Sequence, residues 1–204
     1  KEAKKKGLRV YVNYFDDLLI KLLLKNHQKF DLIFSANTIT HISDLNSVFA
    51  NITQILADHG TFIIEEPSLL ETIKKNSYDQ FYNEHIYVLS AISLTNILKK
   101  IKLKIFKIEN LNVHGGSLRY YITHENNKNF KIDKSYRVQI KNEQKYNLDK
   151  FSSCLIFKKN VFKVKNNLFR IFNKLKKKKQ KIIGYGASAK AVTVLNFCNL
   201  KEQF

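Results

Sequence analysis

Phe30-Asp31-Leu32-Ile33-Phe34-Ser35-Ala36 is the stretch that decides the fold, because this mostly apolar run ends abruptly at the polar Asn37. A short apolar run of this kind predicts a buried β-strand. The spacing predicts a helix from about residue 44 to residue 57, a turn at Asp58–Gly60 and a second strand over Thr61–Glu65. Strand, helix and strand joined by short connections indicate a parallel sheet covered by helices.

The segments on either side continue this alternation. Upstream, the pattern predicts a short strand over Leu8–Tyr11 and a helix over Phe15–Lys25. Downstream, it predicts a helix over Leu89–Lys100 and two strands over Lys104–Leu111 and Ser117–His124. The late strand pair is typical of the closing antiparallel edge of an α/β sheet, so the first 125 residues are expected to form one domain.

The remainder of the chain follows a different pattern. Residues 126–148 are polar and show no clear periodicity, whereas apolar residues recur at helical spacing from about residue 148 to 179. We therefore expect one or two connecting helices within residues 126–180. Lys181–Ile183 predicts a strand that opens a further α/β unit, which occupies residues 181–204.

The net charge of +19 is concentrated in the second half of the chain. Residues 1–100 carry 12 Lys and Arg against 11 Asp and Glu, while residues 101–204 carry 24 against 6. All but four of the basic residues are lysine, and arginine forks are the usual readers of bases and phosphates. The charge therefore favours a solvated surface that also attracts anionic ligands, and nucleic acid is not an expected partner.

Cysteine and methionine usage limit the class of protein further. Cys154 and Cys198 form neither a four-ligand zinc site nor a disulfide framework, and we expect two free thiols packed in or near a core. No apolar run is long enough for a membrane-spanning helix. The chain contains no methionine, which we interpret as a piece of a longer, cytoplasmic protein.

Two polar clusters are candidates for chemistry. Asn37 and His41 follow a strand, at the edge where ligands bind in parallel sheets. The motif Tyr82-Asn83-Glu84-His85 places a phenol, a carboxylate and an imidazole within four residues. Imidazole exchanges protons near neutral pH, a carboxylate can orient it, and a phenol can donate to a developing oxyanion.

Two glycine motifs complete the set. His114-Gly115-Gly116-Ser117-Leu118-Arg119 combines paired glycines, which allow positive φ or close backbone approach, with flanking polar groups. Gly184-Tyr185-Gly186-Ala187-Ser188-Ala189 follows a predicted strand and matches the G-x-G-x-x-A phosphate loop of dinucleotide sites. The acidic residue expected some twenty positions later has its nearest match in Glu202. No motif suggests metal ligands.

Taken together, the four motifs resemble the sugar C-methyltransferases that methylate C3 of deoxy-4-keto-hexoses linked to dTDP. The matching stretches are residues 31–45, 78–85, 114–119 and 184–190, in the order of that family. Two departures are visible, because Asn83 stands where the family usually has histidine, and the last motif carries Ser188 and Ala191.

The resemblance implies a fold, a cofactor and a substrate. It implies that residues 1–125 are the C-terminal part of a class I S-adenosylmethionine (SAM) methyltransferase domain with a partial Rossmann-like sheet. Residues 126–180 would then be connecting helices and residues 181–204 the start of a second α/β domain. SAM is the implied methyl donor, a nucleotide-linked keto-deoxysugar the implied substrate, and zinc is implied only in a segment upstream of residue 1.

The resemblance also implies roles for individual residues. His85 is the expected general base, with Glu84 and Tyr82 as orienting or oxyanion-stabilising partners and His41 as a hydrogen-bonding group on the substrate side. Ala36 and Asn37 are expected to face the cofactor. The residues expected to shape the sugar-nucleotide pocket or meet its phosphates are His114, Ser117, Arg119, Gly184, Tyr185 and Lys190.

Two other classes of protein stay open from the residues alone. A dinucleotide-dependent oxidoreductase built on Gly184 and Gly186 predicts binding of NAD(P). A basic nucleic-acid-binding module predicts an affinity that falls steeply with salt.

Overall fold

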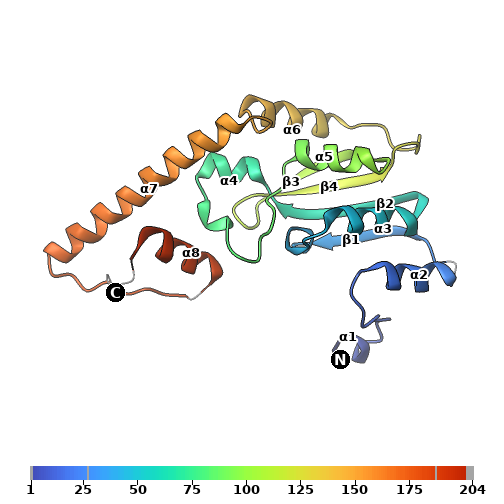
Figure 1. Cartoon of the computed structure of the whole chain (residues 1–204), viewed down its shortest axis with the longest axis horizontal. Helices are drawn as coiled ribbons and strands as arrows, with labels where there is room; N and C mark the ends of the chain where they lie inside the picture. Colours follow the sequence, from blue (N-terminus) through green and yellow to red (C-terminus); the bar gives the residue numbers. More distant parts are fainter. Residues whose placement is uncertain (1, 27, 187, 201–204) are drawn as a thin grey trace.

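A four-stranded sheet forms the centre of the molecule in the computed structural model, which describes residues 2–26, 28–186 and 188–200 (Figure 1). The strands are β1 Phe30–Ala36, β2 Leu56–Pro67, β3 Leu103–Leu111 and β4 Ser117–His124. They lie in the order β1-β2-β4-β3, with β1 and β2 parallel and β4 antiparallel to both neighbours. The expected parallel pair and the expected antiparallel edge are thus confirmed.

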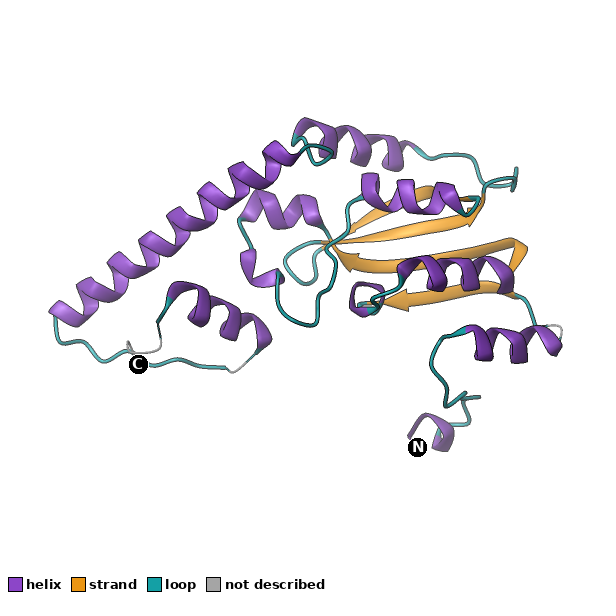
Figure 2. Cartoon of the chain, viewed as in Figure 1, coloured by secondary structure: helices purple, strands orange, loops and turns teal. Residues whose placement is uncertain are grey.

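Helices cover one face of this sheet and extend well beyond it (Figure 2). The α-helices are α1 Glu2–Lys5, α2 Asp17–Lys25, α3 Leu45–Ile55, α4 Leu69–Lys75, α5 Ala91–Lys100, α6 Lys134–Lys145, α7 Phe151–Lys177 and α8 Ala189–Cys198. The short 3-10 helices are η1 Ile39–His41 and η2 Tyr78–Gln80. The fold class is α/β, as the sequence predicts.

The hydrophobic core lies on one face of the sheet, beneath α3 and α5. Alternate residues of a strand point to the same face, so Phe62, Ile64 and Tyr120 are all fully buried there. Phe49 of α3 and Leu94 of α5, both fully buried, belong to the same cluster. Burying each such side chain stabilises the fold by roughly 1.5–3 kcal/mol, which makes the sheet a rigid base for the residues at its edge.

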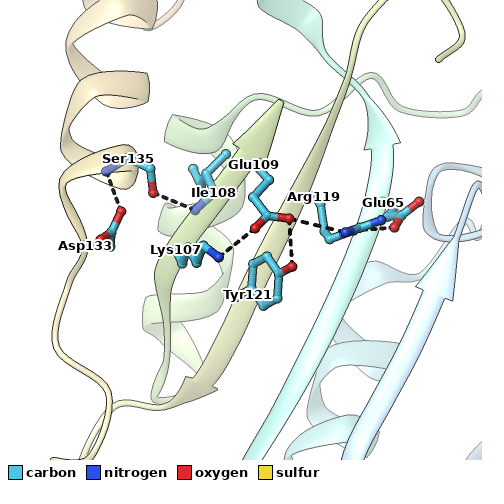
Figure 3. Close-up of polar contacts among 8 residues, drawn as sticks. All are labelled: Glu65, Lys107, Ile108, Glu109, Arg119, Tyr121, Asp133 and Ser135. Carbon is cyan, nitrogen blue, oxygen red and sulfur yellow. Dashed lines mark hydrogen bonds and ion pairs between the residues drawn. The ribbon is translucent and has the colours of Figure 1, made fainter. Parts of the chain in front are cut away.

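The opposite face of the sheet carries a ladder of charged groups (Figure 3). Glu65, Arg119 and Glu109 are cross-strand neighbours on β2, β4 and β3. The Arg119 guanidinium lies 2.5 Å from the Glu65 carboxylate and 3.2 Å from that of Glu109, which also contacts Lys107 at 2.6 Å. Hydrogen bonds from Lys107 and Tyr121 lower the pKa of Glu109. The ladder thus ties three strands together by opposite charges.

Two of the strands differ from the sequence prediction. Residues 8–11 form no strand, since this segment pairs with no described strand and leaves Leu8 60% exposed. Strand β2 begins at Leu56 and includes Asp58–Gly60, because Phe30 pairs with Leu56 whereas Leu32 pairs with Thr61, so the extra residues bulge. Gly60 is needed there, since a Cβ would lie 2.9 Å from the Phe30 carbonyl oxygen.

The C-terminal segments contain two helices within residues 126–180, as expected, but lack the expected strand. The polar stretch 126–148 contains α6, whose fully buried Glu143 caps α5 by accepting hydrogen bonds from the Ala91 and Ile92 N–H groups. One helix of 27 residues, α7, fills the next segment. The strand predicted over Lys181–Ile183 is wrong, since Ile183 is 92% exposed and no strand forms there.

The last helix returns to the body of the molecule. Figure 1 shows α7 leading away from the sheet and α8 lying between α7 and the segment that contains η2. The Tyr78 hydroxyl lies 3.2 Å from the Cys198 sulfur, and burial together with this thiol raises the pKa of Tyr78. Cys198 is buried as expected, but Cys154 is exposed on α7. Within the described ranges, no helix has the length and apolar character needed to cross a bilayer.

Candidate active site

The candidate site begins where the parallel strands β1 and β2 end. Asn37 follows β1 in a left-handed conformation, with φ of 48°, and its N–H donates to the Glu65 carbonyl oxygen at 2.9 Å. The Asn37 side chain is exposed, whereas Ala36 is half-buried. This strand end is therefore a sharp turn with one small and one polar side chain at the carboxyl edge of the sheet, the edge where ligands bind in such folds.

A buried carboxylate holds the turn that follows. Glu66 is fully buried, and its side chain accepts hydrogen bonds from the Thr38 N–H at 2.9 Å and the Ile39 N–H at 2.7 Å. The Thr40 hydroxyl donates to its second oxygen at 2.9 Å. Three donors on one carboxylate fix η1, and they therefore fix the position of His41 at its end.

The Thr40 carbonyl then attaches the segment that contains His85. It accepts hydrogen bonds from the N–H groups of Ile86 at 3.0 Å and Tyr87 at 3.3 Å. The His41 and His85 rings consequently lie edge to face, with centroids 5.0 Å apart. Two histidines predicted from separate motifs are thus brought together at the carboxyl edge of the sheet.

The hydrogen bonds of His85 define its tautomer. Nδ1 lies 2.9 Å from the Gln80 main-chain carbonyl oxygen, which can only accept, so Nδ1 carries the proton. Nε2 therefore has a free lone pair, to which the Tyr82 hydroxyl donates at 2.8 Å. Burial lowers the pKa of His85, only partly offset by the bond to Gln80. His85 is therefore a neutral base at neutral pH.

The Tyr82 phenol is set up as a donor. Burial and the nearby carboxylates of Glu84 and Glu66 raise the pKa of Tyr82, because both effects disfavour a phenolate. The ring is tilted against that of His85, with centroids 4.1 Å apart. The hydroxyl keeps its proton at neutral pH and can give it as a hydrogen bond to one acceptor at a time.

Glu84 is placed differently from its neighbours. Its side chain is exposed, and both ring nitrogens of His85 are taken by Tyr82 and the Gln80 carbonyl. The structure therefore brings Glu84 close enough to influence Tyr82 but leaves it no ring nitrogen of His85 to bind. Its role in orienting the base stays a prediction.

The residues of the glycine-pair motif lie apart from His85. His114 is exposed with φ of 51°, and Ser117 is buried with its hydroxyl donating to the Val113 carbonyl oxygen at 3.2 Å. Arg119 belongs to the charged ladder, on the sheet face opposite to Glu66. The structure thus gives Ser117 and Arg119 internal partners, and their contact with a substrate stays a prediction.

Gly116 explains why this loop carries paired glycines. Its φ is 121°, and a Cβ there would lie 2.8 Å from the Glu71 Cγ.

Gly116→Ala is therefore expected to lower the free energy of unfolding by about 3 kcal/mol, measured by urea denaturation. Gly7→Ala is the matched control, since Gly7 has φ of 76° but no atom within 4 Å of the added Cβ. Equal losses in the two variants would contradict the close approach.

The fourth motif reaches the site through Lys190. Helix α8 contacts η2, and Lys190 lies in its first turn. The charges of His41 and Lys190 add to burial in lowering the pKa of His85. Gly184 and Tyr185 are exposed and line a largely apolar hollow of about 500 Å³ with residues of α8. Ala187 and Glu202 lie outside the described residues.

Two residues of the site are not among the predicted ones. Glu66 looks in sequence like any acidic strand end, and only its three donors reveal its function in holding the turn. Gln80 lies within the quoted motif 78–85, but a glutamine carries no titratable group and so gave no chemical signal. The Glu66 carboxylate accepts from the main-chain N–H groups that precede His41, whereas Gln80 acts on His85 through its own main-chain carbonyl, which accepts from the His85 ring.

Comparisons with known proteins identify methyltransferases as the similar proteins. A family model described as a methyltransferase domain matches residues 3–108, and one described as the C-methyltransferase C-terminal domain matches residues 112–204. The C-methyltransferase NovU of Streptomyces niveus is 31% identical over 87 residues, which are 43% of this chain and 21% of NovU. The aligned part thus spans about a fifth of that relative.

Solved methyltransferase structures are similar at lower identity. A S-adenosylmethionine-dependent methyltransferase from Clostridium acetobutylicum is 16% identical with a TM-score of 0.45, over 60% of this chain and 68% of that one. A possible histamine N-methyltransferase from Thermotoga maritima is 19% identical with a TM-score of 0.39, over 48% of this chain and 56% of that one.

The fold and the site define an α/β protein with a hydrogen-bonded pair, Tyr82 and His85, at the carboxyl edge of its sheet. The chain belongs to the methyltransferase-domain family, whose model covers more than half of it. The oxidoreductase alternative gains no support from the matched models, and the strand that a dinucleotide loop requires before Gly184 is absent from the described residues.

Proposed function

We propose that this protein is part of a SAM-dependent C-methyltransferase that methylates the carbon next to the ketone of a nucleotide-linked keto-deoxysugar. The observation that carries the proposal is the His85–Tyr82 pair, which lies beside His41 at the carboxyl edge of the sheet. A C-methyltransferase must remove a proton from carbon, and a neutral imidazole with a fixed tautomer is suited to that task. The match of the C-methyltransferase C-terminal domain to residues 112–204 supports the same reaction.

The residues at the end of β1 fit one wall of a SAM site. In the described part of the chain, the Asn37 side chain binds no other residue and is exposed, so its amide is free for a ligand. Ala36 beside it is small, which leaves room at the strand end. SAM, when bound, supplies an electrophilic methyl group. No glycine lies between Gly7 and Gly60, so this part of the chain contains no glycine-rich loop.

Tyr82 and His85 have linked roles in this reaction. In the present arrangement the Tyr82 hydroxyl occupies the lone pair of His85 Nε2. A ketone oxygen that accepts the same hydroxyl would release Nε2, which could then take the proton from the neighbouring carbon. The hydroxyl would at the same time stabilise the enolate oxygen that this proton removal creates. Substrate binding would thus expose the base only where it is needed.

The remaining predicted residues have supporting roles in the proposal. His41 bonds the sugar beside His85, and Lys190, together with the motif at Gly184 and Tyr185, meets the diphosphate. A cationic side chain near the site favours an anionic nucleotide. The domain boundaries after residues 125 and 180 and a cytoplasmic location stay predictions.

The proposal is tested with the protein expressed from its whole reading frame. With methyl-labelled SAM and a dTDP-linked 4-keto-deoxyhexose, label is expected on the carbon next to the ketone. In deuterium oxide without SAM, the same carbon is expected to exchange its hydrogen, which isolates the proton-removal step. A protein that binds the sugar nucleotide yet supports neither labelling nor exchange contradicts the proposal.

Tyr82→Phe is expected to lower kcat for methyl transfer about 10²-fold, because the enolate oxygen loses its donor. The measurement is methyl transfer from labelled SAM at saturating substrate. Tyr87→Phe is the matched control, since the Tyr87 hydroxyl donates to the Ser43 carbonyl oxygen at 2.6 Å and does not touch His85. A Tyr82→Phe enzyme as fast as the wild type means that the phenol has no part in the reaction.

A further inference from the structure

Gln80 occupies a central position between the glycine loop and His85. It is 3% exposed and ends η2. Its side-chain Nε2 donates to the His114 carbonyl oxygen at 2.7 Å, while its own carbonyl oxygen accepts from His85 Nδ1 at 2.9 Å. One residue thus connects the loop 112–116 to the imidazole through two consecutive hydrogen bonds.

The loop offers a fixed point of attachment. Three successive carbonyl oxygens are held by donors from the segment 68–80. The His114 oxygen is bound by Gln80, the Gly115 oxygen by Lys75 Nζ at 2.6 Å, and the Gly116 oxygen by the Ser68 N–H at 3.0 Å. These three hydrogen bonds and the close approach of Gly116 to Glu71 restrict the conformation of the loop.

The orientation of the Gln80 amide is also determined. Its Oε1 is buried without a partner in the described part of the chain. Turning the amide over would place this oxygen against the His114 carbonyl oxygen, so the Nε2 donor must face the loop. Leaving an oxygen unpaired is unfavourable, and a buried polar group of this kind calls for a specific explanation. The bond to the loop supplies one.

We propose that Gln80 is a positioning residue for His85, with its side chain anchored on the glycine loop so that its main-chain carbonyl holds the imidazole in the Nδ1–H tautomer. The tautomer matters because it leaves Nε2, the nitrogen that faces Tyr82, as the basic one. This inference rests on the proposed function only in treating His85 as a base. The loop 112–116 thereby acquires a role that needs no contact between the loop and the substrate.

The test is Gln80→Met, which keeps the length of the side chain but removes the donor. The nitrogen-15 shifts of the His85 ring are expected to change from a single Nδ1–H tautomer in the wild type to a mixture of both tautomers. In the methyl-transfer assay, kcat is expected to fall about tenfold with little change in KM, because the base is misplaced while the pocket is kept.

Lys75→Met is the matched control, because it removes one of the three donors to the loop but leaves both hydrogen bonds of Gln80 in place. Its tautomer and kcat are expected to equal those of the wild type. A folded Gln80→Met protein with the wild-type tautomer overturns the proposal. An Nε2–H tautomer in the wild-type protein overturns it too, even if the variant does not fold. A mixed tautomer with unchanged kcat supports the anchoring by Gln80 and contradicts His85 as the base, so the two claims fail separately.

Discussion

His85→Ala is expected to lower kcat for methyl transfer about 10³-fold, because proton removal from carbon loses its base. Hydrogen exchange at the carbon next to the ketone, followed by NMR in deuterium oxide without SAM, is expected to fall by the same factor. SAM affinity, measured by calorimetry, should stay within about twofold of the wild type, since His85 lies among Tyr82, Gln80 and His41 and not at the end of β1.

His59→Ala serves as the matched control for this variant. His59 lies in the bulged part of β2, with Nδ1 3.4 Å from the Asn129 side chain, and has no contact with the candidate site. It is expected to leave kcat and exchange unchanged. Normal exchange in His85→Ala would mean that another group removes the proton, and a parallel loss in both variants would indicate general damage.

The pH profile of the wild-type enzyme is a second, independent test of His85 as the base. Neutral imidazole is the active form, and burial lowers the pKa of His85 below its ordinary value of 6.5. Activity should therefore be retained as pH falls through 6.5 and decline only below it. Because the folded state favours neutral His85, its contribution to stability is also present above 6.5 and decreases as pH falls. An acid limb with an apparent pKa above 6.5 would contradict the lowered pKa of His85.

The parts of the fold that the sequence predicts well are those governed by local rules. The run Phe30–Ala36 and the run Ser117–His124 form strands with the predicted bounds, because an apolar period bounded by polar residues is a local signal. Lys181–Ile183 carries the same signal but forms no strand, since a strand also needs a partner to satisfy its backbone groups. Helix α6 is mostly polar and so has no clear apolar period. It is held against the sheet domain by Glu143, whose buried carboxylate accepts hydrogen bonds from the first N–H groups of α5, a contact between residues far apart in the sequence.

The candidate site shows the same division between local and distant information. Sequence motifs selected His41, Tyr82 and His85, and the structure brings these three together. The same reasoning expected Arg119 to shape a substrate pocket, which stays a prediction, but it could not foresee that the guanidinium binds Glu65 and Glu109 across the open face of the sheet. A motif identifies residue types that can take part in catalysis or binding. The carboxylates that Arg119 contacts, however, are set by the register of the strands.

Glu66→Ala is expected to cause the largest loss of stability, about 4 kcal/mol in the free energy of unfolding. The substitution leaves the N–H groups of Thr38 and Ile39 and the Thr40 hydroxyl without their acceptor, and the hydrogen bonds of Ile39 and Thr40 are buried. Each unpaired donor then bears a desolvation penalty that the folded state cannot recover from water. The measurement is urea denaturation followed by circular dichroism, with the midpoint shift converted through the slope of the wild type.

Two further variants separate the hydrogen bonds of Glu66 from its position in β2. Glu66→Gln keeps an oxygen for the N–H groups and is expected to lose only about 1–2 kcal/mol. Glu65→Ala changes the neighbouring residue, whose carboxylate faces the other side of the sheet, and should destabilise the protein less than Glu66→Ala does.

Glu66→Ala should also abolish hydrogen exchange at the substrate carbon, even at temperatures where the variant stays folded. The reason is that the turn held by Glu66 carries His41, and its Thr40 carbonyl binds the segment that follows His85. Full exchange activity in the folded variant would show that the histidines are held by other contacts, and the buried carboxylate would then have a purely structural role.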